Sequence, residues 1–198
     1  MDKAPLDDRA LDQLFREART FNGYQNRDVD DATLEAIWEL AKMGPTSANC
    51  LPARIVWVKS GEQRERLAGL VSEGNAEKVR NAPVTAIIGM DLRFHDLLPE
   101  LFPHADAKSW FEGDQPLIEG TAFRNSSLQG AYVVLAARAL GLDTGPMSGF
   151  DSDAVRAAFF ADQPNVAVNF LTTLGYGDPA SVWPRSPRPE FVRFNRVV

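Results

Sequence analysis

Five short polar segments, scattered along the chain, are the part of this sequence that could do chemistry. In chain order they are Arg19-Thr20-Phe21-Asn22, Pro45-Thr46-Ser47-Ala48-Asn49, Asn75 with Lys78, Gly145-Pro146-Met147-Ser148-Gly149, and Arg185 with Arg188. Cations could bind a phosphate, small polar side chains a sugar chain, and closely approaching backbone N–H groups the ring nitrogens of a planar molecule. Together they predict a site for a phosphorylated planar cofactor, and FMN fits that description.

Taken one at a time, these segments have ordinary structural explanations. Thr46, Ser47 and Asn49 could be turn residues after a helix that ends at Gly44-Pro45. Arg19 could be a solvated cation at the end of a helix, where positive charge suits the helix dipole. The prediction of a cofactor site therefore depends on the whole set.

Several common catalytic motifs are missing from the sequence. No Gly-x-Gly-x-x-Gly follows a predicted strand, and there is neither a Walker phosphate loop nor a His-Glu-x-x-His helix. One cysteine, Cys50, and two histidines, His95 and His104, are too few for a disulfide or for most zinc sites. The serine of 145–149 is misplaced for the Gly-x-Ser-x-Gly of a hydrolase. We therefore expect neither a metal enzyme nor a serine hydrolase.

Charge is unevenly spread along the chain. Twenty-one Lys and Arg against 27 Asp and Glu give a net charge of −6, which argues against nucleic acid as a partner. The last 14 residues nevertheless carry four arginines and one glutamate. Prolines at 179, 184, 187 and 189 exclude a regular helix there, so we predict that residues 179–198 form an extended basic arm laid on another surface.

Length and hydropathy indicate the broad class of the protein. No apolar run approaches the length of a membrane span, and the first residues do not resemble a signal peptide. We expect a cytoplasmic protein without a membrane partner. The 198 residues favour a single domain that spans residues 1–198.

The prediction mixes helices and strands in the first half of the chain. Apolar spacing predicts helices from about residue 6 to 19 and from about 31 to Gly44-Pro45. Ser60 and Gln63 form a capping box for a helix to about residue 71, and a short helix follows at 75–81. β-branched runs predict strands at 55–58 and 84–90, the latter buried on both faces.

The second half contains the longest predicted helix, over about 117–140, which is rich in small residues and ends at Gly141. Before it, residues 91–115 form a loop or broken helix too long for an ordinary connection, and we predict that this aromatic segment covers the substrate. Residues 141–150 read as a turn-rich stretch. A short helix capped by Asp151 or Ser152 and a strand at 166–174 complete the prediction.

From about Ala18 to Arg188 the chain resembles the FMN-dependent nitroreductase superfamily, and within it the malonic semialdehyde reductase subgroup of pyrimidine utilisation. The motifs that carry the resemblance are Ala18-Arg19-Thr20 with Asn22-Gly23, Gly44-Pro45-Thr46-Ser47-Ala48-Asn49-Cys50, Pro83-Val84-Thr85-Ala86-Ile87, Leu101-Phe102-Pro103-His104 with Ser109-Trp110-Phe111, Thr121-Ala122-Phe123-Arg124-Asn125-Ser126-Ser127, residues 139–151, and Gly175-Tyr176-Gly177-Asp178. The resemblance implies an α+β fold with a central, mostly antiparallel sheet flanked by helices. It also implies a homodimer with exchanged terminal arms and one FMN in each of two interface sites.

The resemblance implies three groups of FMN contacts. The phosphate and ribityl contacts are Arg19, Thr20, Asn22, Asn75, Lys78, Arg185 and Arg188. The segment that approaches the flavin from the partner subunit is Pro45, Thr46, Ser47 and Asn49. The turn whose backbone N–H groups face the N5 edge is Pro146, Met147, Ser148 and Gly149.

This sequence departs from the family pattern at a few positions. Asn22 stands where many relatives have a cation, a role that Arg185 and Arg188 could take over. Leu51 replaces a common glutamine and Ala53 a common tryptophan. Ser148 stands where many nitroreductases have a glutamate.

The resemblance further implies an NAD(P)H oxidoreductase that reduces malonic semialdehyde to 3-hydroxypropanoate by ping-pong hydride transfer through flavin N5. His104, Trp110, Phe111 and Arg124 are candidates for the substrate pocket, with His104 or Arg124 as proton donor or carboxylate anchor. Trp110 and Phe111 could instead fill the core. Two other functions stay open, a broad nitro or quinone reductase and a flavin-binding dimer without turnover. No motif distinguishes NADH from NADPH.

Overall fold

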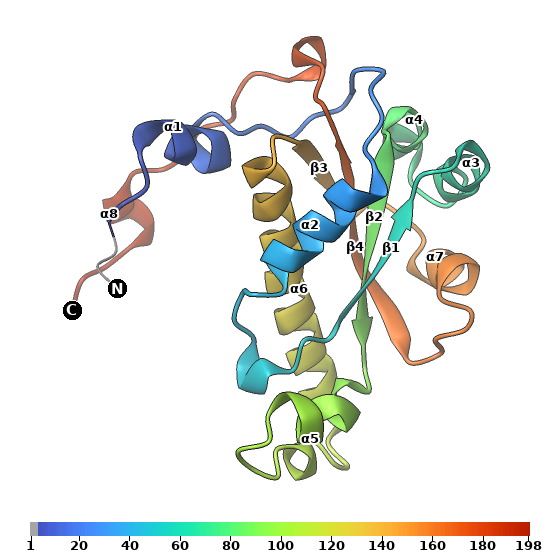
Figure 1. The fold of residues 1–198 in the computed structure, drawn as a ribbon, viewed down its shortest axis with the longest axis vertical. Helices are drawn as coiled ribbons and strands as arrows, with labels where there is room; N and C mark the ends of the chain where they lie inside the picture. The colour runs from blue at the N-terminus through green and yellow to red at the C-terminus, as the bar shows by residue number, and fades with distance from the viewer. Residues whose placement is uncertain (1–3) are drawn as a thin grey trace.

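The computed structural model describes residues 4–198, and the prediction about a signal peptide falls partly on residues 1–3, outside this range. At its centre is an antiparallel sheet of strands β1 (Ala53–Val58), β2 (Val84–Asp91), β3 (Asp143–Met147) and β4 (Val166–Gly175), in the order β1-β2-β4-β3 (Figure 1). The strands predicted at 55–58, 84–90 and 166–174 are confirmed. The α+β fold with a mostly antiparallel sheet is confirmed with them.

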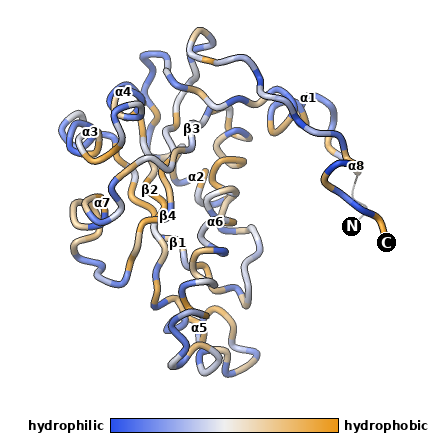
Figure 2. Tube along the Cα trace, turned by 180° about the vertical axis from the view of Figure 1, so that it is seen from behind, coloured by the Kyte–Doolittle hydropathy of each residue, from blue (hydrophilic) through white to orange (hydrophobic). Residues whose placement is uncertain are grey.

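Helices cover both faces of the sheet. Helices α2 (Asp31–Ala41) and α6 (Gln115–Ala139) pack on one face, while α3 (Gly61–Ala68), α4 (Glu73–Asn81) and α7 (Ser152–Phe159) pack on the other (Figures 1 and 2). Strand β2 is buried between the two layers, because Val84, Ala86 and Ile88 pack toward α2 and α6 while Ile87 packs toward the other helices. This is the strand that the sequence predicts to be buried on both faces.

Helix α6 lies close against the sheet and ends where the sequence predicts. A Cβ atom on Gly130 would overlap the ring of Phe170 on β4, so the missing side chain allows the close approach. Gly141 follows the helix with a φ of 81°, the left-handed conformation that ends many helices. At Gly130, the absence of a side chain therefore serves packing within one chain.

The first predicted helix is wrong in its extent and type. The structure has α1 (Asp8–Leu11) followed by a short π-helix, η1 (Asp12–Arg16), and the helical backbone stops before Arg19. The carbonyl of Leu14 accepts a hydrogen bond of 3.0 Å from the guanidinium of Arg138 instead of one from the next helical turn. Residues 18–22 are thereby free to run along β3.

The turn-rich reading of residues 141–150 is also wrong, because β3 lies there. The carbonyl of Thr144 points away from β4 and accepts from the N–H of Phe21 (3.1 Å). Pro146, two residues on, faces the same way, so its missing N–H leaves the ladder with β4 intact. One glycine and one proline, Gly145 and Pro146, make this edge strand unrecognisable to a pattern based on β-branched residues.

The segment 91–115 is a broken helix, as predicted. It contains η3 (Phe94–Leu97), α5 (Leu98–Leu101) and η4 (Lys108–Trp110), and its apolar residues form a separate cluster with Cys50, Ile118 and Ala122 at one end of α6. Figure 1 shows α5 and the rest of this segment at the bottom of the molecule, apart from the arm that carries the chain termini.

Both chain ends project together from the body as an arm (Figure 1). The C-terminal part contains η5 (Pro179–Ser181) and is otherwise irregular until α8 (Phe191–Phe194), a single helical turn. The prediction of an arm without helix is wrong over that turn, which begins after the last proline, Pro189. Within residues 4–198, no helix is both long and apolar enough to cross a membrane.

Candidate functional site

A cavity of about 400 Å³ lies between the start and the end of the chain, and arginines dominate its wall. Its lining residues are Phe15, Ala18, Arg19, Thr20, Asn22, Arg138, Trp183, Pro184, Arg185, Ser186 and Arg188. None of these is an aspartate or glutamate. The wall thus contributes four positive charges and no negative one, which suits a ligand with a multiply charged anionic group.

Hydrogen bonds between the two chain ends build this cavity. Arg19 donates to the carbonyl of Trp183, Arg185 donates to the carbonyl of Ala18 (3.2 Å), and Asn22 donates to the carbonyl of Ser181 (3.0 Å). Among residues 4–198, no carboxylate forms an ion pair with any of the four arginines. Because no carboxylate pairs with these guanidinium groups, N–H groups remain for a ligand.

Arg138 is the charged lining residue that the sequence does not predict. It lies in the last turn of α6, where a basic side chain has an ordinary explanation in the helix dipole, and only the packing of η1 brings it to the cavity. Partial burial lowers the pKa of its guanidinium, and nearby Asp143 opposes that shift. Burial in turn raises the pKa of the Asp143 carboxyl, against the opposing hydrogen bond from the N–H of Gly177.

Strand β3 connects the segment 19–22 to the turn at 145–149. Thr20 forms a parallel bridge with Thr144, so the two segments run side by side. A Cβ atom on Gly145 would lie 2.6 Å from the carbonyl oxygen of Phe21, so only glycine allows this approach. The structure therefore brings together two of the five predicted segments that are more than a hundred residues apart.

Asn75 joins the same edge of the sheet. Its side chain donates to the carbonyl of Gly149 (3.1 Å), which also accepts from the N–H of Ser72 (2.9 Å). Within the described chain, the N–H groups of Ser148 and Gly149 have no hydrogen-bond acceptor, so both are available to a ligand. Lys78 lies one turn further along α4, partly exposed and, among residues 4–198, without an ion pair.

The fifth predicted segment, 45–49, lies elsewhere in the same chain. The N–H of Ser47 donates to the Asn125 side chain (2.8 Å), near the middle of α6. Asn125 and Arg138 are thirteen positions apart on that helix, which corresponds to about 20 Å along its axis. One chain therefore does not bring 45–49 to the arginine cavity. Next to it, burial raises the pKa of the Cys50 thiol to about 11, so Cys50 is a neutral packing residue.

The four candidates for a substrate pocket are separated. Phe111 is 6% exposed and packs edge-on against Phe94 in the lower cluster, which favours the core alternative for this residue over the pocket wall. Trp110 is 53% exposed, and both it and the exposed His104 lie beside the ring of Phe102. Arg124 is exposed on the outer face of α6, in a shallow groove with Phe123 and Leu128.

The chain matches the nitroreductase family over residues 15–176. A relative from Burkholderia lata, named "Putative NADH dehydrogenase/NAD(P)H nitroreductase", is 62% identical over 97% of this chain and 98% of its own. Two solved structures have the same fold. A "putative nitroreductase" from Bacillus subtilis has a TM-score of 0.88 at 21% identity, over 97% of this chain and 100% of its own. Another, from Exiguobacterium sibiricum in complex with FMN, has a TM-score of 0.85 at 19% identity, over 100% of both chains.

Proposed function

This chain belongs to the nitroreductase family, and from that premise we propose that it is an NAD(P)H-dependent flavin oxidoreductase. Its cofactor is FMN and its reductant NADH or NADPH, in agreement with the name of the Burkholderia lata relative and with the FMN-bound homologous structure. We expect the reaction in the cytoplasm. The observation that carries the proposal is the wall of four arginines without a carboxylate.

The residues present fit FMN at both ends of the cofactor. The phosphate monoester of FMN is doubly charged near neutral pH, and Arg19, Arg138, Arg185 and Arg188 together can neutralise it. At the other end, the free N–H groups of Ser148 and Gly149 can donate to the ring. Gly149 also lacks space for a side chain, because a Cβ atom there would lie 2.5 Å from the hydroxyl of Ser72.

The remaining predicted contacts have supporting roles in this proposal. Thr20 and Asn22 face the cavity and would bind the ribityl chain, while Lys78 supplies a further cation from α4. Asn75 holds the carbonyl of Gly149 and so orients the turn that carries the free N–H groups. FMN bound there would carry hydride from NAD(P)H to an electron acceptor. Positive charge and N–H donors favour the anionic reduced ring.

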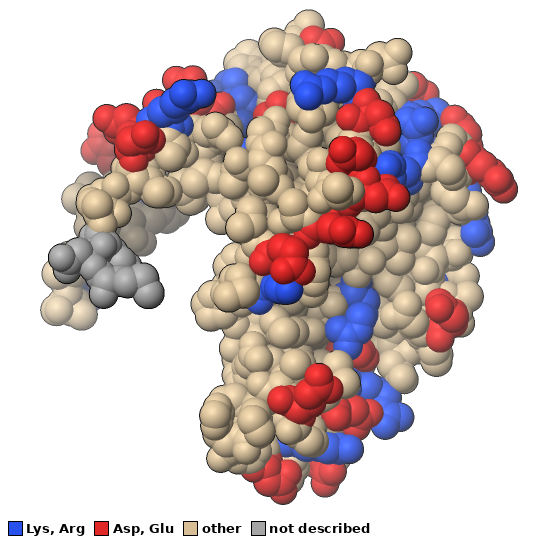
Figure 3. Space-filling view, in the orientation of Figure 1, with Lys and Arg blue, Asp and Glu red and all other residues tan. Residues whose placement is uncertain are grey.

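We assign the missing segment 45–49 to a second copy of the chain. The arm exposes four apolar side chains, each to between 62% and 84%: Phe191, Val192, Phe194 and Val197. A patch of exposed apolar side chains is typical of a surface that another protein chain covers. Figure 3 shows the body hollowed beneath the arm, and the outer face of α6 exposes Leu117, Phe123 and Leu128. A homodimer with exchanged arms would cover these surfaces and bring Pro45, Thr46, Ser47 and Asn49 of one subunit to the cavity of the other.

For the substrate we propose malonic semialdehyde, reduced to 3-hydroxypropanoate in pyrimidine breakdown. The aldehyde carbon accepts the hydride and its oxygen takes a proton, while NAD(P)H is oxidised to NAD(P)⁺. Arg124 supports this choice, because it is a cation in an apolar groove and has no ion pair among residues 4–198. It would bind the carboxylate of the substrate, and the exposed His104 is the candidate proton donor.

A broad nitro or quinone reductase is the second candidate. The name of the Burkholderia lata relative favours it, and so does the exposed ring of Trp110 beside the partly buried Phe102, on which a planar acceptor could stack. In that case Arg124 would have no part in substrate binding.

Anaerobic stopped-flow of the FMN-loaded protein separates these functions. NADH or NADPH should bleach the flavin absorbance, and malonic semialdehyde should restore it. Arg124→Gln should raise the KM for the aldehyde and leave the bleaching step unchanged. Reoxidation only by nitroaromatics or quinones would favour the broad reductase. Bound FMN that neither NADH nor NADPH reduces would indicate a flavin-binding dimer without turnover.

A further inference from the structure

The loop between α2 and β1 has an unfavourable backbone conformation at three residues that are not glycine. Ala48, Asn49 and Leu51 have φ values of 47°, 51° and 38°, in the left-handed region where the Cβ atom crowds the backbone. Such residues keep this conformation only where surrounding contacts hold them, and they concentrate at functional sites. The contacts that hold this loop therefore indicate what sets its shape.

One face of α6 supplies three of these contacts. The side chain of Asn125 accepts from the N–H of Ser47 (2.8 Å), that of Gln129 accepts from the N–H of Ala53 (2.8 Å), and the hydroxyl of Tyr132 donates to the carbonyl of Pro45 (2.9 Å). Positions 125, 129 and 132 follow the i, i+4, i+7 spacing of a single helical face. Asn125 is 0% exposed and Gln129 1%, so both are buried polar side chains that hydrogen-bond to the backbone of this segment.

The Asn125 amide is fixed at both ends. Its Nδ2 donates to the carbonyl of Thr121 one turn earlier (2.8 Å), so its Oδ1 can point only toward Ser47. On the other side of the loop, a Cβ atom on Gly44 would overlap the ring of Tyr132, so that ring lies directly against the backbone. Helix α6 therefore holds the loop by hydrogen bonds at both Pro45 and Ser47.

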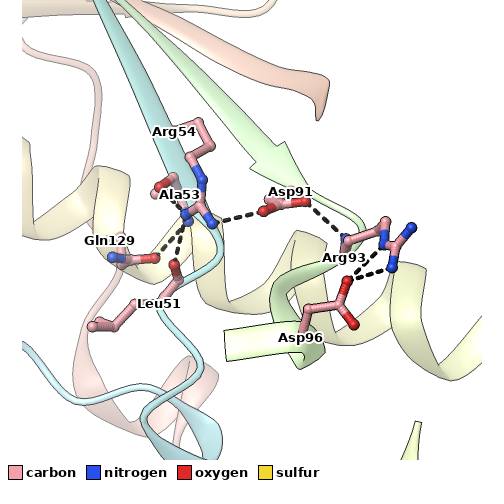
Figure 4. Close-up of polar contacts among 7 residues, drawn as sticks. All are labelled: Leu51, Ala53, Arg54, Asp91, Arg93, Asp96 and Gln129. Carbon is pink, nitrogen blue, oxygen red and sulfur yellow. Dashed lines mark hydrogen bonds and ion pairs between the residues drawn. The ribbon is translucent and has the colours of Figure 1, made fainter. Parts of the chain in front are cut away.

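A second set of contacts fixes the end of the loop to the sheet. The guanidinium of Arg54 donates to the carbonyl of Leu51 (3.1 Å) and forms a half-buried ion pair with Asp91 at 2.6 Å. Figure 4 shows Arg54 and Gln129 reaching the backbone of residues 51–53 from opposite sides. The shape of the loop is therefore set by α6 and by the β1–β2 ends, before any ligand binds.

We propose that Asn125, together with Tyr132 two turns further along α6, is a positioning residue for the flavin site. It holds the backbone of Ser47 so that residues 45–49 of one subunit meet the cofactor bound by the other. This proposal rests on the proposed function, because the loop must lie at the flavin for its shape to matter. The amide does not touch the cofactor and acts only through Ser47.

The side chain of Asn49 extends the consequence to the segment 91–115. Its Nδ2 donates to the carbonyl of Leu101 in α5 (2.9 Å), so the loop and the predicted substrate cover are joined. Loss of the Asn125 contact should therefore loosen both the flavin loop and the attachment of the cover. A residue with a purely local packing role would not have this effect.

The test compares Asn125→Leu and Tyr132→Phe with Ser126→Ala in the FMN-loaded homodimer. Ser126 is the matched control, because it is buried on the same helix and accepts from Asn169 but has no contact with the loop. Two quantities are measured, the Kd for FMN by flavin fluorescence and the exchange rate of the Ser47 amide hydrogen. Asn125→Leu should raise each by about tenfold, and Tyr132→Phe, which removes one exposed hydroxyl, should raise the Kd about threefold. Ser126→Ala should lower the Tm alone.

Two results would overturn the proposal. One is an Asn125→Leu protein that folds and exchanges its Ser47 amide as slowly as the Ser126→Ala control, which would show that the amide does not hold the loop. The other is fast exchange with an unchanged Kd for FMN, which would show that the loop does not serve the flavin. If Asn125→Leu does not fold, Tyr132→Phe takes its place, and an unchanged Kd for FMN in that variant would overturn the proposal. Failure of the wild-type protein to bind FMN would instead overturn the proposed function itself.

Discussion

The arginine cavity and the loop 45–51 are two halves of one proposed site, and they are built in opposite ways. The cavity collects four cations from both chain ends and from α6, and its contacts among protein groups are hydrogen bonds to backbone carbonyls. The loop contributes no charge. It depends on three left-handed residues held by the buried amide of Asn125 and by Arg54.

This difference predicts different failures. Binding by charge has no strict geometry, so the loss of one cation weakens it in proportion and added salt screens it. Binding by a preorganised loop depends on positions, so the loss of one buried hydrogen bond changes the whole segment. Charge should therefore determine which group is bound, and the loop how well the ring is held.

The largest effect is expected from Arg19→Gln. Removal of one charge-assisted contact to the FMN phosphate should raise the Kd for FMN by about 10- to 100-fold. Arg66→Gln is the control, since Arg66 lies over the ring of Phe159 on the other face of the sheet. Isothermal titration at two salt concentrations would check this, and the difference between the variants should shrink at high salt. Equal affinities for the two variants would contradict the role of the cavity.

A smaller effect is expected from Asp143→Asn. Burial raises the pKa of this carboxyl above its ordinary value, so the folded state disfavours the charged form. The folded state therefore holds its proton more tightly than the unfolded state does. As the pH rises from the ordinary pKa of the carboxyl to the raised one, the free energy of unfolding falls. Asparagine does not ionise, so this loss of stability should disappear. Its side-chain oxygen can still accept from the N–H of Gly177, and no negative charge remains beside Arg138 to offset its positive charge. Thermal unfolding against pH should show a gain in Tm only above this window, with a severalfold tighter FMN complex at neutral pH. A gain in Tm at acidic pH alone would contradict this reading.

The smallest effect is expected from Ala48→Gly. Glycine accepts a φ of 47° without the cost of about 1 kcal/mol that alanine bears, so the Tm should rise by about 2 to 4 °C. The loop also becomes more flexible in the free protein, so the Kd for FMN should rise about twofold. Differential scanning calorimetry and fluorescence titration would show stability and affinity moving in opposite directions. A variant that is both more stable and tighter in binding would show that the strain has no use in the site.

The sequence predicts the sheet core and most of the cavity, because those features are local or compositional. Strand β2 is a continuous apolar run, and the arginines of the tail stand out in an acidic chain. Arg138 and β3 could not be predicted. Arg138 lines the cavity because the π-helix η1 ends at Arg16, about one turn before the predicted end of the first helix. Strand β3 depends on pairing between residues 20 and 144. Patterns among neighbouring residues do not reveal pairing between positions that are so far apart in the sequence.

The loop 45–51 shows the same limit. Its residue types predict a turn, and the turn is there, but nothing in Ala48 or Leu51 indicates a left-handed backbone. The buried amide that holds it lies about 80 positions away, in a helix whose composition indicates only close packing.

The most direct test of the account compares the affinities of FMN and riboflavin, which differ only in the phosphate, for the wild-type protein, Arg19→Gln and Asn125→Leu. We expect the wild-type protein to prefer FMN strongly, Arg19→Gln to lose most of this preference, and Asn125→Leu to bind both ligands more weakly by the same factor and so to keep the preference. A wild-type protein that binds riboflavin as tightly as FMN, or a preference unchanged in Arg19→Gln, would contradict the assignment of the arginine cavity to the phosphate.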